Sequence, residues 1–438
     1  MNILYFHTHD SGCCLEPYGA PVPMPNLMNF SRDAVLFRNN FCAGPTCSPS
    51  RVGLLTGRYP HQTGMLGLAH RGFAMEKPEE HLSHFLANNG YETVLAGIQH
   101  EADDPSVLGY SIIIGDASHN MKHEEPFDTE AYDIANAQSV SDYFHKGPSK
   151  PFFLSVGMFN THRPFPASQG SVRSEYVSPP SGICDTPQNR RDFADYIRSA
   201  AIVDRAFGMV YDALKTSGLL DETVVLFTTD HGIAFPGMKC NLTDGGMKVA
   251  QILRIPGYKG GRAIDELTSH LDIFPTLCEI GQLNEPDWLE GTSLLPLIRD
   301  GEAVRSEVFS EISFHAGYDP QRAIRTKRYK YIRKFDLNDL PVRSNVDDCP
   351  AKTLLLDAGY YERAQARNSL FDLVCDPQEM VNLSGKPEYA EIESCLRDRL
   401  EKWMSETDDP LCAGHVEMPQ GAIVNSRRCV SPVEAYFD

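Results

Sequence analysis

The stretch ETVVLFTTDHG, residues 222–232, sets the architecture of the chain. Its run of apolar and β-branched residues favours a strand buried on both faces, which is typical of parallel sheets. The run ends abruptly at Asp230-His231, so the strand is predicted to carry these two polar residues at its carboxyl end.

Two further stretches change from an apolar run to polar residues in the same way. They are NILYF before His7-Thr8-His9-Asp10, and KPFFLSVGMF before Asn160-Thr161-His162. Helical patterns at residues 79–90 and 191–218, and a strand at 91–96, alternate with these runs. This order predicts an α/β fold with a large, mostly parallel sheet sandwiched by helices. Ligands bind at the carboxyl ends of such strands, so the polar clusters are expected to meet there.

The sequence changes character after about residue 305. AIRTKRYKYIRKF, residues 323–335, alternates as an exposed strand would, and residues 387–406 form an amphipathic helical pattern. We therefore predict a catalytic domain at residues 1–305 and a smaller C-terminal α+β domain at 306–438. Residues 164–189, rich in Pro, Ser and Gly, are predicted to form a surface loop over the site.

The overall composition excludes several classes of protein. A net charge of −19 argues against a nucleic-acid partner, because phosphate backbones are bound through basic patches. The sequence shows neither a signal-peptide pattern nor an apolar run long enough to span a membrane. Twelve cysteines without regular spacing do not form a disulfide scaffold. We expect a cytoplasmic protein with mostly reduced thiols and no membrane partner.

The stretch GPTCSPSRVGLLTGRYPHQTG, residues 44–64, places Cys47 before Pro49 and Arg51. A cysteine nucleophile normally needs a histidine partner and an activating environment, which this stretch does not supply. The pattern resembles the active-site signature of the type I sulfatases, and the chain is most similar to their sulfamidase-like bacterial branch. The resemblance implies an alkaline-phosphatase-like fold, and a maturation enzyme that oxidises Cys47 to formylglycine. The other eleven cysteines are interpreted as small buried apolar residues.

The chemistry of an aldehyde explains the choice of residue. A hydrated aldehyde at position 47 has two hydroxyls: one attacks sulfur, and deprotonation of the other expels sulfate and restores the aldehyde. Serine cannot perform the second step. Arg51, one helical turn along, is expected to hold the hydrate and balance its developing charge.

The resemblance also implies a site for one divalent metal ion. Its ligands would be Asp10, Asp230, His231 and the oxygen of residue 47, with His9 either a fifth ligand or a group that orients Asp10. Calcium is the ion of the family. Because imidazole suits manganese or zinc better than calcium, a transition metal remains an alternative.

Three further residues correspond to family positions around the sulfate. His100 corresponds to the base beside the hydrate, and its unperturbed pKa near neutrality suits that role. His162 and Lys239 correspond to residues that contact the sulfate and protonate the leaving atom. Three departures from the family are His9 in place of aspartate, Ile98 in place of lysine and Lys239 in place of arginine. The sequence does not decide whether the substrate is reached by Arg163, His70 or Arg71.

These observations predict a sulfatase that hydrolyses a sulfate ester or a sulfamate, on a small sulfated carbohydrate. A phosphonate or phosphate diester hydrolase of the same superfamily is one alternative. The other is an inactive homologue that binds sulfated glycans. The sequence does not determine the oligomeric state or the identity of the substrate.

Overall fold

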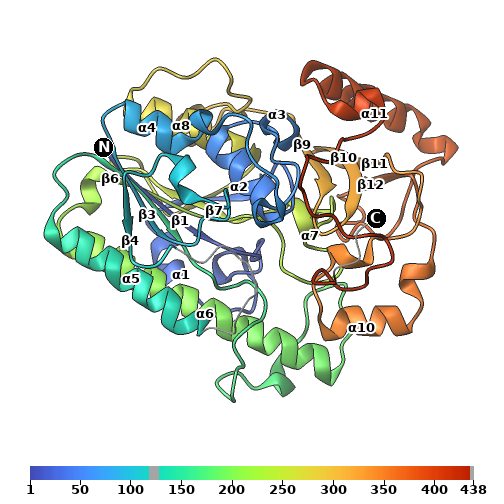
Figure 1. The fold of residues 1–438 in the computed structure, drawn as a ribbon, viewed down its shortest axis with the longest axis horizontal. Helices are drawn as coiled ribbons and strands as arrows, with labels where there is room; N and C mark the ends of the chain where they lie inside the picture. Colours follow the sequence, from blue (N-terminus) through green and yellow to red (C-terminus); the bar gives the residue numbers. More distant parts are fainter. Residues whose placement is uncertain (118–127, 435–438) are drawn as a thin grey trace.

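An eight-stranded sheet forms the centre of the computed structural model, which describes residues 1–117 and 128–434 (Figure 1). Seven strands run parallel, and β7 is antiparallel to both of its neighbours. Across the sheet the strands are β4 (Ile112–Ile114), β3 (Glu92–Gly97), β5 (Phe152–Gly157), β1 (Asn2–Thr8), β6 (Thr223–Thr229), β7 (Gln251–Arg254), β2 (Val35–Phe41) and β8 (Arg262–Ser269). The predicted large, mostly parallel sheet is confirmed.

Helices cover both faces of this sheet, as Figure 1 shows. One face packs against α1 (Pro25–Ser31), α5 (Thr129–Lys146) and α6 (Pro187–Thr216), and the other against α2 (Cys47–Thr56), α4 (Leu82–Asn88), α8 (Ile273–Gly281) and α9 (Leu295–Asp300). Side chains alternate along β1, so Leu4 and Phe6 enter the first core and Ile3 and Tyr5 the second. Each fully buried side chain of this size contributes about 2 kcal/mol to stability.

A second sheet of four antiparallel strands lies beside the first. Its order is β12 (Asn368–Asp372), β11 (Tyr329–Lys334), β10 (Tyr318–Thr326) and β9 (Glu307–Phe314). The remaining helices are α3 (Pro60–Thr63), α7 (Asp244–Met247), α10 (Pro350–Asp357) and α11 (Ala390–Glu406). Leu396, Leu400 and Trp403 of α11 pack in one core with Ile324 and Tyr331 of the sheet. The smaller C-terminal α+β part is therefore confirmed as an architecture, and the domain boundary stays a prediction.

The predicted single strand at 323–335 is wrong, because the stretch forms β10, a tight turn and β11. The turn residues Lys327 and Arg328 are not among the Gly, Pro, Asn and Asp residues that usually mark a turn, so the sequence did not reveal it. The prediction of an exposed strand is also wrong: Lys330 is fully buried and pairs with Asp244 and Glu379, with Nζ to oxygen distances of 2.6 and 2.8 Å. Burying a charge requires such partners.

Two other expectations can be compared with the structure. All twelve cysteines lie in the described part of the chain and are free, but four are exposed, which contradicts their interpretation as buried apolar residues: Cys184, Cys375, Cys395 and Cys412. Cys395 lies on α11 and the other three lie in loops or short turns, and sequence spacing does not reveal their exposure. Within residues 1–117 and 128–434, no helix combines the length and apolar character that a membrane span requires.

Candidate active site

The carboxyl ends of neighbouring strands bring the predicted polar residues together. β5, β1 and β6 lie side by side, and His162, Asp10 and Asp230 follow them in the chain. His100 follows β3, the next strand beyond β5. The predicted convergence of these clusters at one edge of the sheet is therefore what the structure shows.

The backbone after β1 fixes the two aspartates against each other. Asp10 has a left-handed conformation with φ of 42°, which aspartate tolerates better than most residues. In this conformation its backbone N–H donates to Asp230 Oδ1 at 2.9 Å. Lys239 Nζ donates to Asp10 Oδ2 at 3.1 Å. Both carboxylates are thereby held in the interior, where they are at most 3% exposed.

Helix α2 brings Cys47 and Arg51 to this edge. Ser50 Oγ donates to the carbonyl oxygen of Asp230, which fixes the first turn of the helix. Arg51 NH2 donates to Asp230 Oδ2 and to the carbonyl oxygen of Thr8, both at 2.9 Å. Burial alone would raise the pKa of Asp230, but the charges of His231 and Arg51 lower it. In this structure Arg51 therefore orients and ionises Asp230, and its contact with a hydrate at residue 47 stays a prediction.

The thiol of Cys47 lies at the base of the site, 1% exposed, with Sγ 3.3 Å from His231 Nε2. Burial raises its pKa well above the usual value, and the negative charges of Asp10 and Asp230 act in the same direction. The opposing effects of Lys239 and Arg51 do not reverse this shift. An activated cysteine nucleophile requires the opposite shift. The unmodified thiol is therefore not poised to react as a thiolate.

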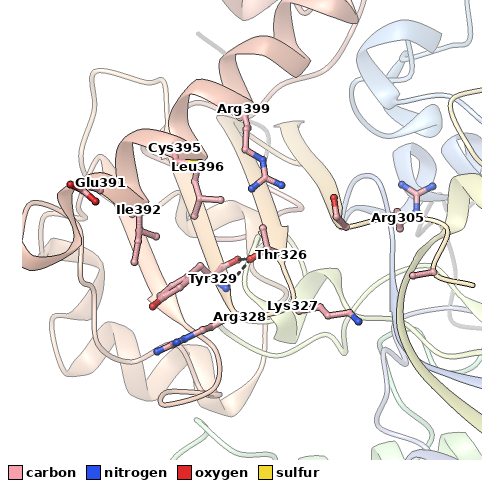
Figure 2. A pocket seen from close by; sticks show the side chains of 12 residues that line it. Arg305, Thr326, Lys327, Arg328, Tyr329, Glu391, Ile392, Cys395, Leu396 and Arg399 are labelled. Atoms are coloured by element: carbon pink, nitrogen blue, oxygen red, sulfur yellow. Dashed lines mark hydrogen bonds between the residues drawn. The ribbon is translucent and has the colours of Figure 1, made fainter.

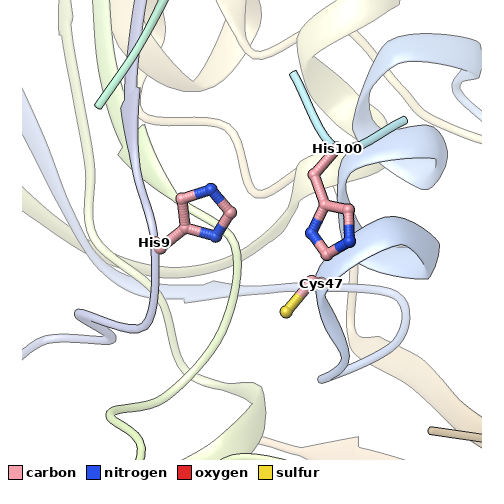
Figure 3. Close-up of side chains that lie close together, drawn as sticks. All are labelled: His9, Cys47 and His100. Carbon is pink, nitrogen blue, oxygen red and sulfur yellow. The ribbon is translucent and has the colours of Figure 1, made fainter. Parts of the chain in front are cut away.

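Two imidazoles flank the thiol, and Figure 3 shows His9 and His100 with Cys47 between their side chains. His9 Nδ1 lies 3.5 Å from Asp230 Oδ2. His100 Nε2 lies 2.9 Å from His70 Nδ1. Burial lowers the pKa of both rings, and the positive charge of Arg51 contributes to each shift. Both rings are therefore neutral at neutral pH and can accept a proton or a metal ion.

The donor atoms fit a divalent cation. His9, Asp10, Cys47 and Asp230 each offer one ligand atom, and these four atoms lie within 4.8 Å of one another. Among the described residues, neither ring nitrogen of His9 nor Oδ1 of Asp10 has a hydrogen-bond partner. His231 Nε2 lies 3.4 Å from that same Asp10 oxygen. Buried polar atoms without partners are costly, so this set has unused binding capacity.

A cavity of about 80 Å³ opens above the thiol. It is lined by Cys47, Leu68, His70, Arg71, His100, His162, Lys239, His315, Ala316, Asp347, Pro432 and Val433. Its volume is well below the roughly 300 Å³ or more of a pocket that encloses a whole ligand, so it suits a compact anionic group rather than a whole sugar ring. A substrate must therefore place one group inside and keep the rest at the mouth.

Sequence reasoning missed the C-terminal wall of this cavity, formed by His315, Asp347 and Pro432 with Val433. They lie in segments without an apolar period or a recognisable motif, so only tertiary contacts reveal them. Arg71 fixes part of this wall, because its guanidinium donates to the carbonyl oxygens of Ala316 and Pro432.

The structure also places the residues that the sequence left open. His70 and Arg71 line the cavity, whereas Arg163 pairs with Asp192 at 2.6 Å and does not line it. None of the described residues lining the cavity belongs to the predicted loop at residues 164–189, so its position over the site stays a prediction. Segments from the C-terminal part line the cavity instead.

A larger cavity of about 680 Å³ lies between α11 and the turn from β10 to β11 (Figure 2). Large pockets are the usual first candidates for a binding site. Its lining includes four cationic side chains, each paired with an acid: Arg305 with Asp272, Lys327 with Glu266, Arg328 with Asp372, and Arg399 with Glu307. Because it contains none of the predicted site residues, we assign the chemistry to the smaller cavity.

A mostly parallel sheet that presents carboxylates, imidazoles and a helix N-terminus at one edge has the layout of an α/β enzyme. Residues 14–282 match the family described as Sulfatase, and residues 239–342 match N-sulphoglucosamine sulphohydrolase, C-terminal. The first match spans more than half of the chain, so the protein belongs to the sulfatase family. It is a sulfuric ester hydrolase.

Known proteins of this kind resemble the chain over most of its length. It is 26% identical over 468 residues to N-sulphoglucosamine sulphohydrolase of Homo sapiens, covering 94% of this chain and 91% of that protein. It is 24% identical over 480 residues to an ulvan-active sulfatase of Formosa agariphila, covering 97% and 77%. The solved phosphonate monoester hydrolase of Agrobacterium radiobacter has a TM-score of 0.73 at 20% identity, covering 97% and 99%. This last likeness concerns the fold alone.

Proposed function

We propose that the protein removes sulfate from a small sulfated carbohydrate, as an ester or a sulfamate, through a formylglycine made from Cys47 by a maturation enzyme. The observation that carries this proposal is the position of Cys47: first residue of α2, at the base of the cavity, between His9 and His100. The names of the human and Formosa relatives refer to sulfated sugars, which supports the substrate class.

The environment of Cys47 favours conversion over direct use of the thiol. Because burial raises the thiol pKa, little thiolate forms at neutral pH. A hydrated aldehyde at the same position would place one hydroxyl towards the sulfur of the substrate. The second hydroxyl would then lose its proton, which releases sulfate from the residue.

A divalent metal ion fits this site, held by Asp10, Asp230, His231, the oxygen on residue 47 and, in one arrangement, His9. When bound, it would act as a Lewis acid on oxygens of the substrate and the hydrate. Two carboxylates suit calcium, and the imidazole nitrogens favour manganese or zinc. Arg51 keeps Asp230 ionised and oriented for this role.

Proton transfers can be assigned to His100 and Lys239, whereas His162 is a hydrogen-bond acceptor. His100 is neutral because burial lowers its pKa, so it can accept the proton of the second hydroxyl. Burial lowers the pKa of His162 to about 4, and its Nδ1 lies 2.5 Å from the carbonyl oxygen of Arg163. Its N–H is thus directed to that carbonyl, which leaves Nε2 as an acceptor. Lys239 then remains as the cation that balances charge on the sulfate and can supply a proton to the leaving atom.

The proposal is tested by the chemical state of residue 47. The peptide that contains it should react with hydrazide probes and show the mass loss of thiol-to-aldehyde conversion. Cys47→Ala should lower kcat on the order of 10⁴-fold or more without loss of folding. Cys278→Ala is the matched control, since that buried thiol lies in α8 away from the cavity. Full turnover by protein with an intact Cys47 thiol would refute the mechanism.

The alternative chemistries are measured in the same assay. Aryl phosphonates and phosphate diesters serve as competing substrates, because a phosphonate hydrolase shares this fold. Preferential turnover of these compounds would assign the site to that chemistry. Binding of sulfated sugars without any turnover, by protein that carries the aldehyde, would favour an inactive glycan-binding homologue.

A further inference from the structure

One acidic residue of the C-terminal part reaches the cavity. Asp347 precedes α10, its side chain is 16% exposed, and Oδ2 lies 3.1 Å from Lys239 Nζ. It is the one acid among the described residues that line the cavity. It belongs neither to the signature around Cys47 nor to the family positions around the sulfate.

A carboxylate is unexpected beside an anionic sulfate. Burial would raise the pKa of Asp347, but the positive charge of Lys239 lowers it below its usual range, so the group is ionised. Lys239 does not neutralise it fully, because the same ammonium also binds Asp10 at 3.1 Å. Asp347 Oδ2 is itself buried and faces Lys239 Nζ at 3.1 Å, while 16% of the side chain stays exposed. Because the carboxylate also borders the cavity, its other oxygen is the one that can accept a hydrogen bond from a substrate.

The neighbours of Asp347 indicate which part of the substrate it faces. It pairs directly with Lys239, the residue proposed to contact the leaving atom. Its carboxylate would repel sulfate oxygens, whose negative charge requires the cationic side of the cavity. The carboxylate is therefore suited to the leaving group rather than to the sulfate.

Sulfate esters and sulfamates differ in the charge of the leaving group. In both reactions the sulfur bond to the leaving atom breaks, its electron pair stays on that atom, and an oxygen from water bonds to sulfur. At neutral pH an ester and one water give a neutral alcohol, the sulfate dianion and a proton. A sulfamate and one water give an ammonium ion and the sulfate dianion at neutral pH. Only the nitrogen leaving group becomes cationic, and it carries an N–H before cleavage.

We propose that Asp347 makes this site favour a sulfamate over a sulfate ester, by accepting a hydrogen bond from the leaving nitrogen and balancing its positive charge. This inference rests on the proposed function. The competing role is purely structural, with Asp347 holding Lys239 in place. The two roles predict different results, because a misplaced Lys239 would impair both substrates equally.

The first experiment compares Asp347→Asn with Asp348→Asn in the mature, metal-loaded protein. Asp348 is the matched control: it is adjacent, its side chain is 56% exposed, and it pairs with Lys352 at 2.8 Å. The substrates are glucosamine N-sulfate and glucose sulfated at carbon 2, which differ only in the leaving atom. The ratio of their kcat/KM values should fall at least about tenfold in Asp347→Asn, through loss on the sulfamate. It should stay unchanged in Asp348→Asn. An equal loss on both substrates, or an unchanged ratio, overturns the proposal.

A second experiment measures binding and does not depend on the state of residue 47. Glucosamine, which is cationic, should bind wild-type protein more tightly than glucose, and Asp347→Asn should abolish the difference. Equal binding of the two sugars to wild type contradicts the role of Asp347. If wild type hydrolyses neither test substrate nor any other sulfate ester, the proposed function fails. The binding of the two sugars then still tests the role of Asp347 separately.

Discussion

Two buried clusters of charged residues differ in how many of their side-chain polar atoms have hydrogen-bond partners. The site cluster consists of His9, Asp10, Arg51, Asp230 and Lys239, at the carboxyl edge of the large sheet. The joint cluster connects α3 to the second sheet and consists of His61, Glu311, Arg322 and Asp409. Each contains two carboxylates, an arginine and a histidine, and each offers acids and imidazole at distances that could hold a metal ion.

In the joint cluster the charged side chains are fully paired with one another or with backbone carbonyl groups. His61 Nδ1 lies 2.6 Å from Glu311 Oε2, and its Nε2 lies 3.0 Å from the carbonyl oxygen of Thr407. Arg322 binds both oxygens of Asp409 and also contacts Glu311 at 3.2 Å. No side-chain polar atom of these four residues lacks a partner within the described chain.

The site cluster, in contrast, keeps polar atoms unpaired and borders a cavity. His9 Nδ1 and Nε2, Asp10 Oδ1 and Arg51 Nε have no hydrogen-bond partner among the described residues. Satisfied networks stabilise a structure, whereas unsatisfied buried groups are tolerated where a ligand will complete them. The difference teaches that residue composition alone does not distinguish a structural cluster from a binding site. The two clusters are distinguished by whether their buried polar atoms have hydrogen-bond partners.

The largest effect should follow from Asp10→Asn, which removes an acid from the site cluster. Asparagine tolerates the left-handed backbone of this position, so stability without metal should change by less than about 1 kcal/mol. Activity should fall on the order of 1000-fold or more, because a carboxylate ligand is lost. Wild type should gain about 3 kcal/mol of stability from calcium or manganese at 100 times Kd, and the variant should not. Calorimetry with and without chelator measures this, and Asp33→Asn at an exposed position is the control.

Arg322→Met, in the joint cluster, should have the opposite effect: a large loss of stability with little change in activity. It leaves Glu311 and Asp409 buried without their arginine, at a cost of about 3 to 5 kcal/mol in the free energy of unfolding. Activity per folded molecule should stay within about threefold of wild type, since Arg322 does not line the cavity. Arg333→Met, which removes a surface pair with Glu401, should cost at most about 1 kcal/mol. A folded, stable Arg322→Met protein that has lost activity would contradict the distinction between the clusters.

A smaller effect is expected on acidification, through His270 near the site cluster. This ring is 1% exposed, and burial lowers its pKa to about 3. The unfolded chain takes up a proton near pH 6.5 and the folded protein does not, so stability is lost as pH falls below 6.5. The loss from this residue is about 3 kcal/mol by pH 4. Urea unfolding of metal-free protein should show a shallower dependence for His270→Gln than for wild type. Equal slopes for the two proteins would exclude this contribution, and exposed His415→Gln serves as the control.

The sequence was sufficient to predict the large sheet and one half of the cavity. Continuous apolar runs indicate strands that are buried on both faces. Parallel strands end at a common edge of the sheet, so Asp10, His162 and Asp230 were expected to lie close together. Cys47 and Arg51 were recognised from their spacing. These predictions depend on the order of residues within short stretches of the chain, which a single sequence contains.

The other half of the cavity could not be predicted. Asp347 lies in the stretch NVDDC, where two adjacent acids look like an ordinary solvated surface. It pairs with Lys239 and lines one cavity with His162, and both residues are distant from it in sequence. The hairpin at 323–335 was missed for a related reason, because an alternating pattern contains no sign of where the chain reverses.

The burial of Cys47 also has a consequence for the timing of synthesis. In the finished fold its thiol is 1% exposed, and the cavity above it is walled by residues from 315 onwards. A maturation enzyme could not reach that thiol once these late segments have packed. Residue 47 leaves the ribosome roughly ten seconds to a minute before residue 315 at ordinary translation rates. The proposed conversion of Cys47 would therefore have to occur while the nascent chain is still incomplete or unpacked.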